Sequence, residues 1–440
     1  MAYLTNLVYL CVLLLASPWL IYQAARTGKY RAGFREKFLG HAPVRTGDKP
    51  CVWFHAVSVG EVNLISPLVR MIAAQHPDWE CVISTTSLTG FNQARKKYLG
   101  YSVFYCPLDF SWATRACMRR VRPDCLVLAE LELWPNLIRA AGDSGASVAI
   151  INGRLSEKSF GGYSRLSWIV RRSLEQIELI AAQNNEYAER FRALGAPATS
   201  IHVTGSLKFD GAVTDRNNSV TQSLRRAAGI SSQDIVLLAG STQQPEEMLA
   251  LEAYNALRAR YPHLRLIVVP RHPERFEEVA TQLQAAGVPW QRRSRLSTEG
   301  IRPEARVLLV DTIGELGGWW GAADIAFVGG SIHKRGGQNM IEPAAYGAAV
   351  SFGPNTRNFR DIVRQLLGAN AAVVVNDGVE LTAFVERCLS DRNYAQSLGA
   401  RAQKFVSTQL GATQRTLLLL EDLVTPAPAD VLPFKDRSAA

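Results

Sequence analysis

Residues 51–72, CVWFHAVSVGEVNLISPLVRMI, decide the fold class. They begin with an apolar run that is typical of a buried strand, turn at Ser58-Val59-Gly60, and continue as an apolar helix. The only acid in this stretch, Glu61, stands at the start of the helix. It is a candidate functional residue, and the alternative is that it merely complements the helix dipole.

The same alternation of apolar runs and helical stretches continues along the chain. Short, continuous apolar strands separated by helices indicate a parallel sheet that is covered on both faces. The polar segment 210–223 contains no apolar run and is predicted to be a linker. The predicted strands are 51–57, 80–86, 101–107, 124–131, 147–152, 178–183 and 201–207 before the linker, and 234–241, 265–273, 306–312, 324–331, 348–354 and 371–377 after it.

The chain of 440 residues is therefore expected to be an α/β protein with two tandem Rossmann-like, doubly wound domains. Two such domains place a cleft between the carboxyl ends of their sheets. Because several glycosyltransferases, epimerases and bilobal solute-binding proteins share this architecture, the fold alone does not decide the chemistry. The predicted divisions are a membrane anchor at 1–25, domains at 26–209 and 224–424 around the linker, and a disordered tail at 425–440.

The N-terminus has the features of a membrane anchor. Residues 1–25 contain no charged side chain, and their apolar run of about 20 residues is long enough to cross a bilayer. No positive n-region or cleavage site marks a signal peptide. The alternative is an amphipathic or buried helix, because Pro18 and Thr5-Asn6 interrupt the apolar run. A basic collar predicts a single anchor with the body of the protein on the cytoplasmic side of the membrane, and it consists of Arg26, Lys29, Arg31, Arg35 and Lys37.

Charge and cysteine usage narrow the class of partner. The net charge is +10, and most of this excess lies in the first 210 residues, which favours anionic lipid or an anionic amphiphile. Nucleic acid is excluded because the chain has no helix-turn-helix, no aromatic stacking motif and no dense basic run. The seven cysteines are scattered and never form CxxC, which favours a reducing compartment and argues against a metal site.

Acids and one lysine follow the predicted strands of the first half. Glu130 and Glu132 are two residues apart, so in an extended chain they point to the same side. Buried acids of like charge repel, and they need a role or a partner. The alternatives are that one of them caps a helix and the other contacts an arginine, and that Lys208 is solvated. The candidates of this half are Glu61, Glu130, Glu132, Asn152, Arg154 and Lys208.

In the second half the strongest candidate is the glycine-rich run GGSIHKRGGQNMIEPAAYG at 329–347. Gly336-Gly337 allow a bend with converging N–H groups, and Asn339 can cap the helix that begins at Glu342-Pro343. This combination favours a phosphate, and Glu342 could accept the hydroxyls of a ribose. Arg271-His272 add positive charge after another strand. The alternatives are a glycine loop without a ligand and an ordinary surface turn.

Ten motifs in order resemble the 3-deoxy-D-manno-octulosonic acid (Kdo) transferases of lipopolysaccharide biosynthesis. They are HAVSVGEV, AELELWPN, INGRLS, GSLKFD, GST, PRHPER, DTIGELG, ADIAFVGGS, GGQNMIEPAAYG and GPNTRNF. The resemblance covers nearly the whole chain. It implies an inverting GT-B glycosyltransferase on the cytoplasmic face of the inner membrane that moves Kdo from CMP-Kdo to a lipid A precursor (lipid IVA), with no metal or other cofactor.

The resemblance also implies roles for single residues. Glu61 matches the family's general base, and Glu130 and Lys208 match residues that stabilise the transition state. Gln338 stands where the family usually has histidine, and Gln243 and Pro245 depart from its GST-His-x-Gly-Glu pattern. The positions that match CMP contacts are Arg271, His272, Gly314, Glu315, Leu316, Asn339, Met340, Ile341 and Glu342.

One tension and two rival functions accompany this interpretation. A helix N-terminus should lower the pKa of Glu61 and weaken it as a base, unless burial and neighbouring acids offset the effect. The first rival is a GT-B enzyme that uses another nucleotide sugar, such as a UDP-sugar, on a lipid acceptor. The second is a non-catalytic bilobal binding protein, which would be exported and would not need Glu61.

Overall fold

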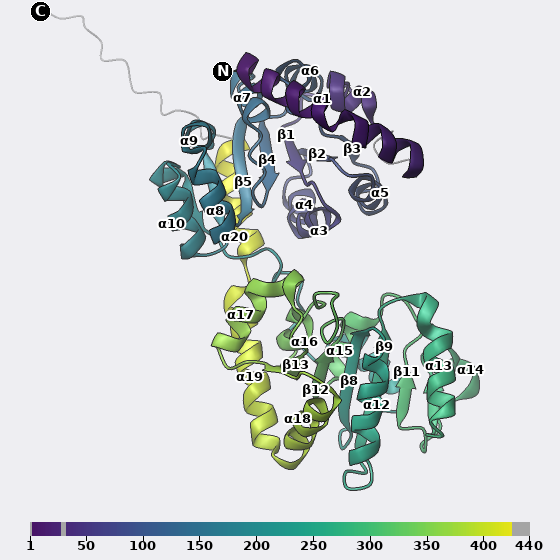
Figure 1. Cartoon of the computed structure of the whole chain (residues 1–440). Helices are drawn as coiled ribbons and strands as arrows, with labels where there is room; N and C mark the ends of the chain where they lie inside the picture. The colour runs from purple at the N-terminus through teal and green to yellow at the C-terminus, as the bar shows by residue number, and fades with distance from the viewer. Residues whose placement is uncertain (1, 28–31, 425–440) are drawn as a thin grey trace, which may run out of the picture. The chain divides into compact units, whose positions relative to one another are not determined.

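The computed structural model describes residues 2–27 and 32–424, which form two compact units (Figure 1). Unit 1 contains residues 1–211 and 410–440, and unit 2 contains residues 212–409. Lys29 and Arg31 of the predicted basic collar, and the predicted disordered tail at 425–440, lie outside the described residues. Each unit is built around its own seven-stranded sheet, as the sequence predicts for two tandem α/β domains.

The sheet of unit 1 has the order β3-β2-β1-β4-β5-β6-β7, and all its strands are parallel. Alternate residues of β1 enter different cores: Val52 and Phe54 pack on one face of the sheet, and Cys51 and Trp53 on the other. This two-sided burial explains the unbroken apolar runs. The strands are β1 (Cys51–His55), β2 (Glu80–Thr85), β3 (Ser102–Tyr105), β4 (Cys125–Ala129), β5 (Ser147–Gly153), β6 (Leu179–Ala182) and β7 (Ile201–Val203).

Helices cover both faces of this sheet. One core cluster joins the sheet to α3, α4, α5 and α20, and the other joins it to α6, α7, α9 and α10. The helices of unit 1 are α1 (Ala2–Thr27), α2 (Phe34–Leu39), α3 (Val59–Leu64), α4 (Ser66–Gln75), α5 (Leu88–Lys97), α6 (Ser111–Val121), α7 (Pro135–Asp143), α8 (Glu157–Ser164), α9 (Ser167–Leu174), α10 (Asn185–Ala193), the 3-10 turn η1 (Ala198–Ser200) and α20 (Ala412–Val424).

Unit 2 repeats the design with the parallel order β10-β11-β9-β8-β12-β13-β14. Its edge strand β10 was not among the predicted strands. The strands are β8 (Ile235–Thr242), β9 (Leu264–Pro270), β10 (Trp290–Arg292), β11 (Val307–Leu309), β12 (Ile325–Val328), β13 (Ala349–Phe352) and β14 (Val373–Val374).

Helices also pack on the sheet of unit 2, where α12, α13 and α18 share a core cluster with its strands. The helices are α11 (Ser219–Ala227), α12 (Glu246–Leu257), η2 (Pro273–Arg275), α13 (Phe276–Ala285), η3 (Arg293–Arg295), α14 (Leu296–Glu299), α15 (Leu316–Ala322), α16 (Ile341–Ala345), η4 (Arg357–Phe359), α17 (Arg360–Gly368), α18 (Gly378–Ser390) and α19 (Arg392–Gln409).

Two boundaries differ from the predicted divisions. The C-terminal helix α20 belongs to unit 1, because Leu417 and Leu420 are fully buried in the core of that unit. The predicted linker 210–223 also contains the first residues of α11. This helix packs against α15, where Gly318 leaves room for Val220.

Helix α1 lies on the surface of unit 1 beside α6 (Figure 1). Asn6 is buried: its side-chain amide donates to Ser111 Oγ (2.8 Å), and its carbonyl oxygen accepts from Ser111 N (3.0 Å). The Tyr9 hydroxyl donates to Asp109 (3.0 Å). The polar residues that interrupt the apolar run therefore attach the helix to the domain. Among residues 2–27 and 32–424, no helix has the combined length and apolarity that a membrane crossing requires.

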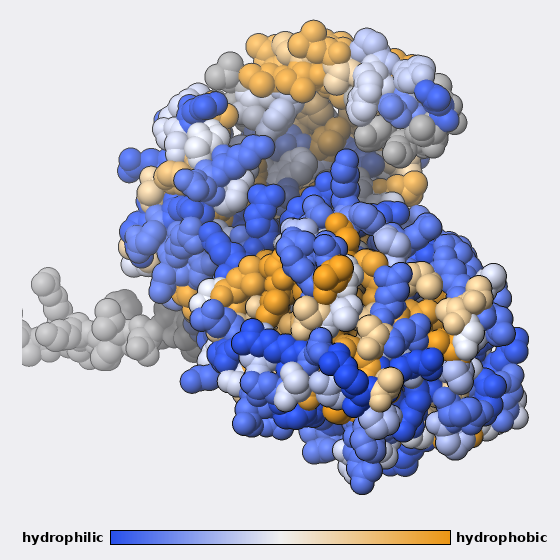
Figure 2. Space-filling view, turned by 60° about the horizontal axis from the view of Figure 1, so that its bottom comes forward, coloured by the Kyte–Doolittle hydropathy of each residue, from blue (hydrophilic) through white to orange (hydrophobic). Residues whose placement is uncertain are grey.

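The outer side of α1 is apolar and exposed. Leu14 and Leu15 are 71% and 84% exposed, and Figure 2 shows this surface as a group of orange side chains at the top of the view. Large exposed apolar side chains in one helix mark an interaction surface. The exposed large apolar residues of α1 are Leu7, Val8, Leu10, Val12, Leu14, Leu15, Trp19, Ile21 and Tyr22.

Candidate active site

Both sheets have a switch point, where the chain order reverses between neighbouring strands. In unit 1 this point lies between β1 and β4, and in unit 2 between β8 and β12. Ligands of doubly wound sheets bind at the carboxyl ends of the strands beside such a point. Glu61 follows β1 and Glu130 follows β4, so the topology places both acids at the switch point of unit 1.

Glu61 lies in the first turn of α3, and both of its carboxylate oxygens are engaged. Ser58 Oγ donates to Oε1 (2.7 Å), and the backbone N–H of Val57 donates to Oε2 (2.8 Å). Ser58 in turn accepts from the Glu61 N–H (3.3 Å), so the two residues form a capping box. A carboxylate has about four acceptor positions, so this arrangement fixes the orientation of the group and leaves acceptor capacity free.

The electrostatics of this corner resolve the tension over Glu61. Burial raises the pKa of Glu61, and this effect outweighs the bonds from Ser58 and Val57; the charge of Glu130 raises it further. Burial also raises the pKa of Glu132 to about 7, and the charges of Glu61 and Glu130 contribute. The three acids therefore interact, and Glu61 is a stronger base than a solvated carboxylate.

Glu130 is paired with Lys208. Lys208 Nζ lies 3.2 Å from Glu130 Oε1, and both side chains are half-buried. The backbone of Glu130 is left-handed, with φ 58°, while its N–H still donates to Ile151 O (2.9 Å). A non-glycine residue in this conformation is strained, and such strain collects at functional sites. The structure thus brings together the two residues that, by the family resemblance, are expected to stabilise the transition state.

Asn152 holds the segment that carries Lys208. Its side chain is completely buried, and its Oδ1 accepts from Leu207 N (3.0 Å) and Ser206 Oγ (3.2 Å). Ser206 Oγ also accepts from Lys208 N (3.4 Å). Asn152 therefore positions Lys208 from the end of β5. In the described part of the chain, Asn152 Nδ2 is buried without a hydrogen-bond partner.

At the switch point of unit 2, the loops after β8 and β12 are joined by one buried carboxylate. Glu246 is 1% exposed and accepts four backbone N–H bonds. Its Oε2 accepts from Gln243 (2.9 Å) and Gly330 (2.7 Å), and its Oε1 accepts from Ser331 (2.9 Å) and Ile332 (3.0 Å). This carboxylate fills a backbone nest and holds the glycine-rich loop in place.

The end of that loop leads into α16, which begins at Ile341 with Met340 as its N-cap, so the predicted N-cap, Asn339, lies one residue before the observed one. Asn339 Oδ1 accepts from Ile341 N (3.1 Å), and Asn339 Nδ2 donates to Glu342 Oε1 (3.0 Å). Burial raises the pKa of Glu342. Met340 and Ile341 have buried side chains, so only their backbone atoms can meet a nucleotide. The remaining oxygen of Glu342 can accept from ligand hydroxyls.

Glu315 is held by protein partners. Arg293 binds it with two bonds, of 3.0 and 2.9 Å, and Thr312 Oγ1 donates to it (2.8 Å). Its carboxylate is thus committed within the protein. The groups that this segment offers to an anion are the backbone N–H groups near Leu316, where α15 begins after the left-handed Gly314 (φ 89°).

Arg271 and His272 follow β9 as predicted. The Arg271 N–H donates to Thr242 O (3.0 Å), which ties the segment to the end of β8, and its side chain is exposed. His272 is half-buried, and its Nδ1 lies 3.8 Å from a Glu274 carboxylate oxygen. Both side chains are accessible at the switch-point edge of unit 2.

The two glutamines that depart from the family pattern meet at one place. A Cβ atom on Gly330 would lie 3.2 Å from the Gln338 side chain and 3.6 Å from Gln243 Nε2. The departures therefore change a single spot beside the loop that Glu246 holds. Neither glutamine titrates, whereas a histidine at either position would.

Glu246 and Arg293 were not among the residues singled out from the sequence, and Glu132 was a candidate without a specific role. Glu246 was visible only as part of the GSTQQPEE segment, and its partners lie 84 to 86 residues away apart from Gln243. The signal for Glu132 was its spacing from Glu130. For Arg293 no local signal existed.

The sequence is similar to those of known proteins over most of its length. A family model of 3-deoxy-D-manno-octulosonic-acid transferases (kdotransferase) matches residues 29–211. The 3-deoxy-D-manno-octulosonic acid transferase of Bordetella pertussis is 36% identical over 413 residues, covering 92% of this chain and 92% of the relative. The corresponding enzyme of Haemophilus influenzae is 34% identical over 421 residues, covering 94% and 97%.

A solved structure shares the fold at low sequence identity. The UDP-GlcNAc 2-epimerase of Neisseria meningitidis, bound to UDP-GlcNAc, gives a TM-score of 0.56 at 12% identity and covers 84% of this chain and 100% of the epimerase. This likeness shows the fold alone. The sequence match to the transferases extends over almost the entire chain and over the relatives' own length. The chain therefore belongs to the 3-deoxy-D-manno-octulosonic acid (Kdo) transferase family.

Proposed function

We propose that this protein transfers Kdo from CMP-Kdo to a lipid A precursor, lipid IVA, with inversion, in lipopolysaccharide biosynthesis. The observation that carries the proposal is the corner of unit 1 at β1 and β4. There a fixed Glu61 with a raised pKa accompanies the Lys208–Glu130 pair. A base, a cation and further acids at a switch point suit the transfer of a sugar to a hydroxyl group. That the sugar is Kdo is inferred from the family to which the chain belongs.

In the proposed reaction Glu61 is the general base. The acceptor hydroxyl oxygen forms a bond to the anomeric carbon, and its proton passes to the Glu61 carboxylate. The bond between the anomeric carbon and the CMP phosphate oxygen breaks, and CMP departs with the electron pair. Attack from the side opposite CMP inverts the anomeric centre. The bonds from Ser58 and Val57 keep the carboxylate in one orientation throughout.

The transition state develops positive charge on the sugar and negative charge on the departing phosphate. Fixed charges that already point at such a site lower the barrier without reorganisation. In unit 1, Lys208 supplies the positive charge that we propose for this purpose. The ion pair with Glu130 keeps the lysine side chain oriented. For CMP we propose Arg271, His272, the backbone of 314–316 and the segment 339–342, with Glu342 accepting the ribose hydroxyls.

We further propose that α1 attaches the protein to the cytoplasmic face of the inner membrane. Its outer apolar side chains would lie in the bilayer interface while Asn6 and Tyr9 hold the helix on unit 1. The exposed Arg26 and Arg35 at and after the end of this helix would meet anionic headgroups. A lipid acceptor is then available at the same surface.

The test is an initial-rate assay of CMP release from CMP-Kdo by detergent-solubilised protein, with and without lipid IVA. Release that depends on the lipid, and that UDP-sugars do not replace, supports the proposal. Release of UDP from a UDP-sugar, with no release of CMP from CMP-Kdo, would instead indicate the rival GT-B enzyme that uses another nucleotide sugar. No release from either donor, by protein that is folded and binds vesicles, contradicts the proposed reaction.

A further inference from the structure

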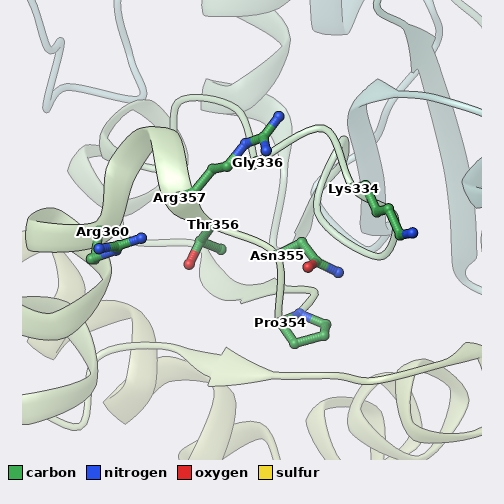
Figure 3. Close-up of a pocket in the computed structure, with 7 residues that line it drawn as sticks. All are labelled: Lys334, Gly336, Pro354, Asn355, Thr356, Arg357 and Arg360. Carbon is green, nitrogen blue, oxygen red and sulfur yellow. The ribbon is translucent and has the colours of Figure 1, made fainter.

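Unit 2 has a concave site whose residues have no role in the reaction proposed above. It is a cavity of about 370 Å³ formed by the loop after β12 and the loop after β13 (Figure 3). Arg357 points over Gly336, while Lys334 and Arg360 stand on opposite sides. The lining residues are Lys334, Gly336, Pro354, Asn355, Thr356, Arg357 and Arg360.

The charge of this pocket is one-sided. Three of its lining residues are cations and none is an acid. In the described part of the chain, Lys334, Arg357 and Arg360 form no ion pair with a carboxylate, although many other arginines of unit 2 do. Three neighbouring cations without a counter-charge repel one another, and they favour an anionic ligand.

The two loops that form the pocket are locked together. The Gly353 N–H donates to Ser331 Oγ (2.7 Å), and the Asn355 N–H donates to Ser331 O (2.8 Å). The Asn358 N–H donates to Gly336 O (2.9 Å). At Gly336, with φ 100°, a Cβ would lie 2.6 Å from the Arg357 side chain, so only glycine lets that arginine cross the loop. The pocket is therefore preformed.

The pocket also shares a loop with the segment 339–342 that is proposed to bind the nucleotide. Gly336 lines the pocket, and Asn339, three residues later, donates a hydrogen bond to Glu342. Glu246 holds the start of the same loop through Gly330 and Ser331. A ligand whose nucleotide lies on the 339–342 segment would thus carry its next group toward Gly336 and Arg357.

We propose that this pocket is an anion subsite that takes the carboxylate of the donor's acidic sugar. The inference rests on the proposed function, because a CMP-linked acidic sugar has its carboxylate on the carbon next to the phosphate oxygen. The planar Arg357 guanidinium can bind a carboxylate with two parallel bonds, which Lys334 and Arg360 support by charge. The subsite would select acidic over neutral sugars. The other anion of the same chemistry is a phosphate of the acceptor lipid.

The test compares three constants in one initial-rate assay: KM for CMP-Kdo, the inhibition constant of CMP, and KM for lipid IVA. Arg357→Gln should raise KM for CMP-Kdo by about 10- to 100-fold, the usual value of a charged hydrogen-bonded pair. CMP inhibition and the lipid KM should remain within about twofold of wild type. Arg357→Lys should give an intermediate KM. Lys404→Gln, on exposed α19, is the matched control for charge and should change none of the constants.

Three results would overturn the assignment. A parallel rise in the CMP inhibition constant would place Arg357 in the nucleotide site. A rise in the lipid KM alone would give the pocket to an acceptor phosphate. Unchanged constants in Arg357→Gln would leave the pocket without a role. If folded wild-type protein releases no CMP from CMP-Kdo, the proposed function fails and the inference falls with it, whereas an active wild type with unaffected variants refutes the subsite alone.

Discussion

Replacement of the buried Glu246 by glutamine should destabilise the loop that carries the proposed donor site. The carboxylate accepts four backbone N–H bonds, two on each oxygen. A glutamine keeps one oxygen, so two of the four N–H groups would face an amide that also donates. A buried, unsatisfied donor costs about 1–3 kcal/mol, and the loss of charge weakens the two remaining bonds. We expect the free energy of local opening of the loop to fall by about 3–6 kcal/mol in all.

Hydrogen exchange measured by mass spectrometry checks this value locally. The peptide that covers 329–337 should lose about 10²-fold or more of its protection, because exchange from a local opening follows the free energy of that opening. Glu252→Gln, at an exposed position of the same helix α12, is the matched control and should leave protection unchanged. If Glu246→Gln exchanged like wild type in this peptide, the carboxylate would not hold the loop.

Three further predictions concern unit 1. Lys208→Met should lower kcat by about 10²-fold, the usual effect of removing one preorganised charge, and an unchanged kcat would exclude its role. In wild type, kcat/KM should fall as the pH drops through about 7, because protonation of Glu132 removes a negative charge near the forming cation. Glu132→Gln should abolish this part of the pH profile. If the decrease near pH 7 persists in the variant, another group is responsible for it. The double change Leu14→Asp and Leu15→Asp should reduce binding to anionic vesicles by at least tenfold in cosedimentation, since each leucine buried in the bilayer contributes about 1.5–3 kcal/mol. Leu418→Asp, at an exposed leucine of α20, should leave binding unchanged. Equal binding of both variants would refute the proposal that α1 binds the membrane.

The fold was largely predictable because most of its strands are buried on both faces; short strands such as β7 and β14 are only partly buried. Every predicted strand overlaps an observed one, since an unbroken apolar run of this length between two helices is typical of a buried parallel strand. Strand β10 was missed because it is a three-residue edge strand that contains Gln291 and Arg292, and no apolar run marks it. Its position depends on pairing with β11, which a local pattern does not show.

The domain boundaries were less predictable, because they depend on which core a helix enters. Helix α20 follows α19 directly in sequence, yet its leucines pack in unit 1. Two bonds from Gly411 and Thr413 to Asp210 fix this return of the chain. These partners are about 200 residues apart and the bonds are polar, so an apolar pattern alone could not reveal them.

In the site, local interactions were predicted well and distant ones poorly. Asn339 bonds to Ile341 and Glu342, within three residues, although the N-cap of α16 is Met340 and not Asn339 as predicted. The raised pKa of Glu61 could not be predicted from the sequence. It results mainly from burial of the carboxylate, which depends on the tertiary packing around it. The pairing of Lys208 with Glu130 joins residues 78 apart through the order of the strands. Their roles in the reaction stay predictions.

The role of Glu61 as general base is tested most directly by CMP release from CMP-Kdo in the presence of lipid IVA, measured for wild type and Glu61→Gln. Glutamine can still complete the capping box with Ser58, so the fold of α3 should survive while the base is lost. We expect lipid-dependent release by wild type and a rate about 10²- to 10⁴-fold lower for the variant, with unchanged CMP inhibition. Release at the wild-type rate by Glu61→Gln would contradict the assignment of the base.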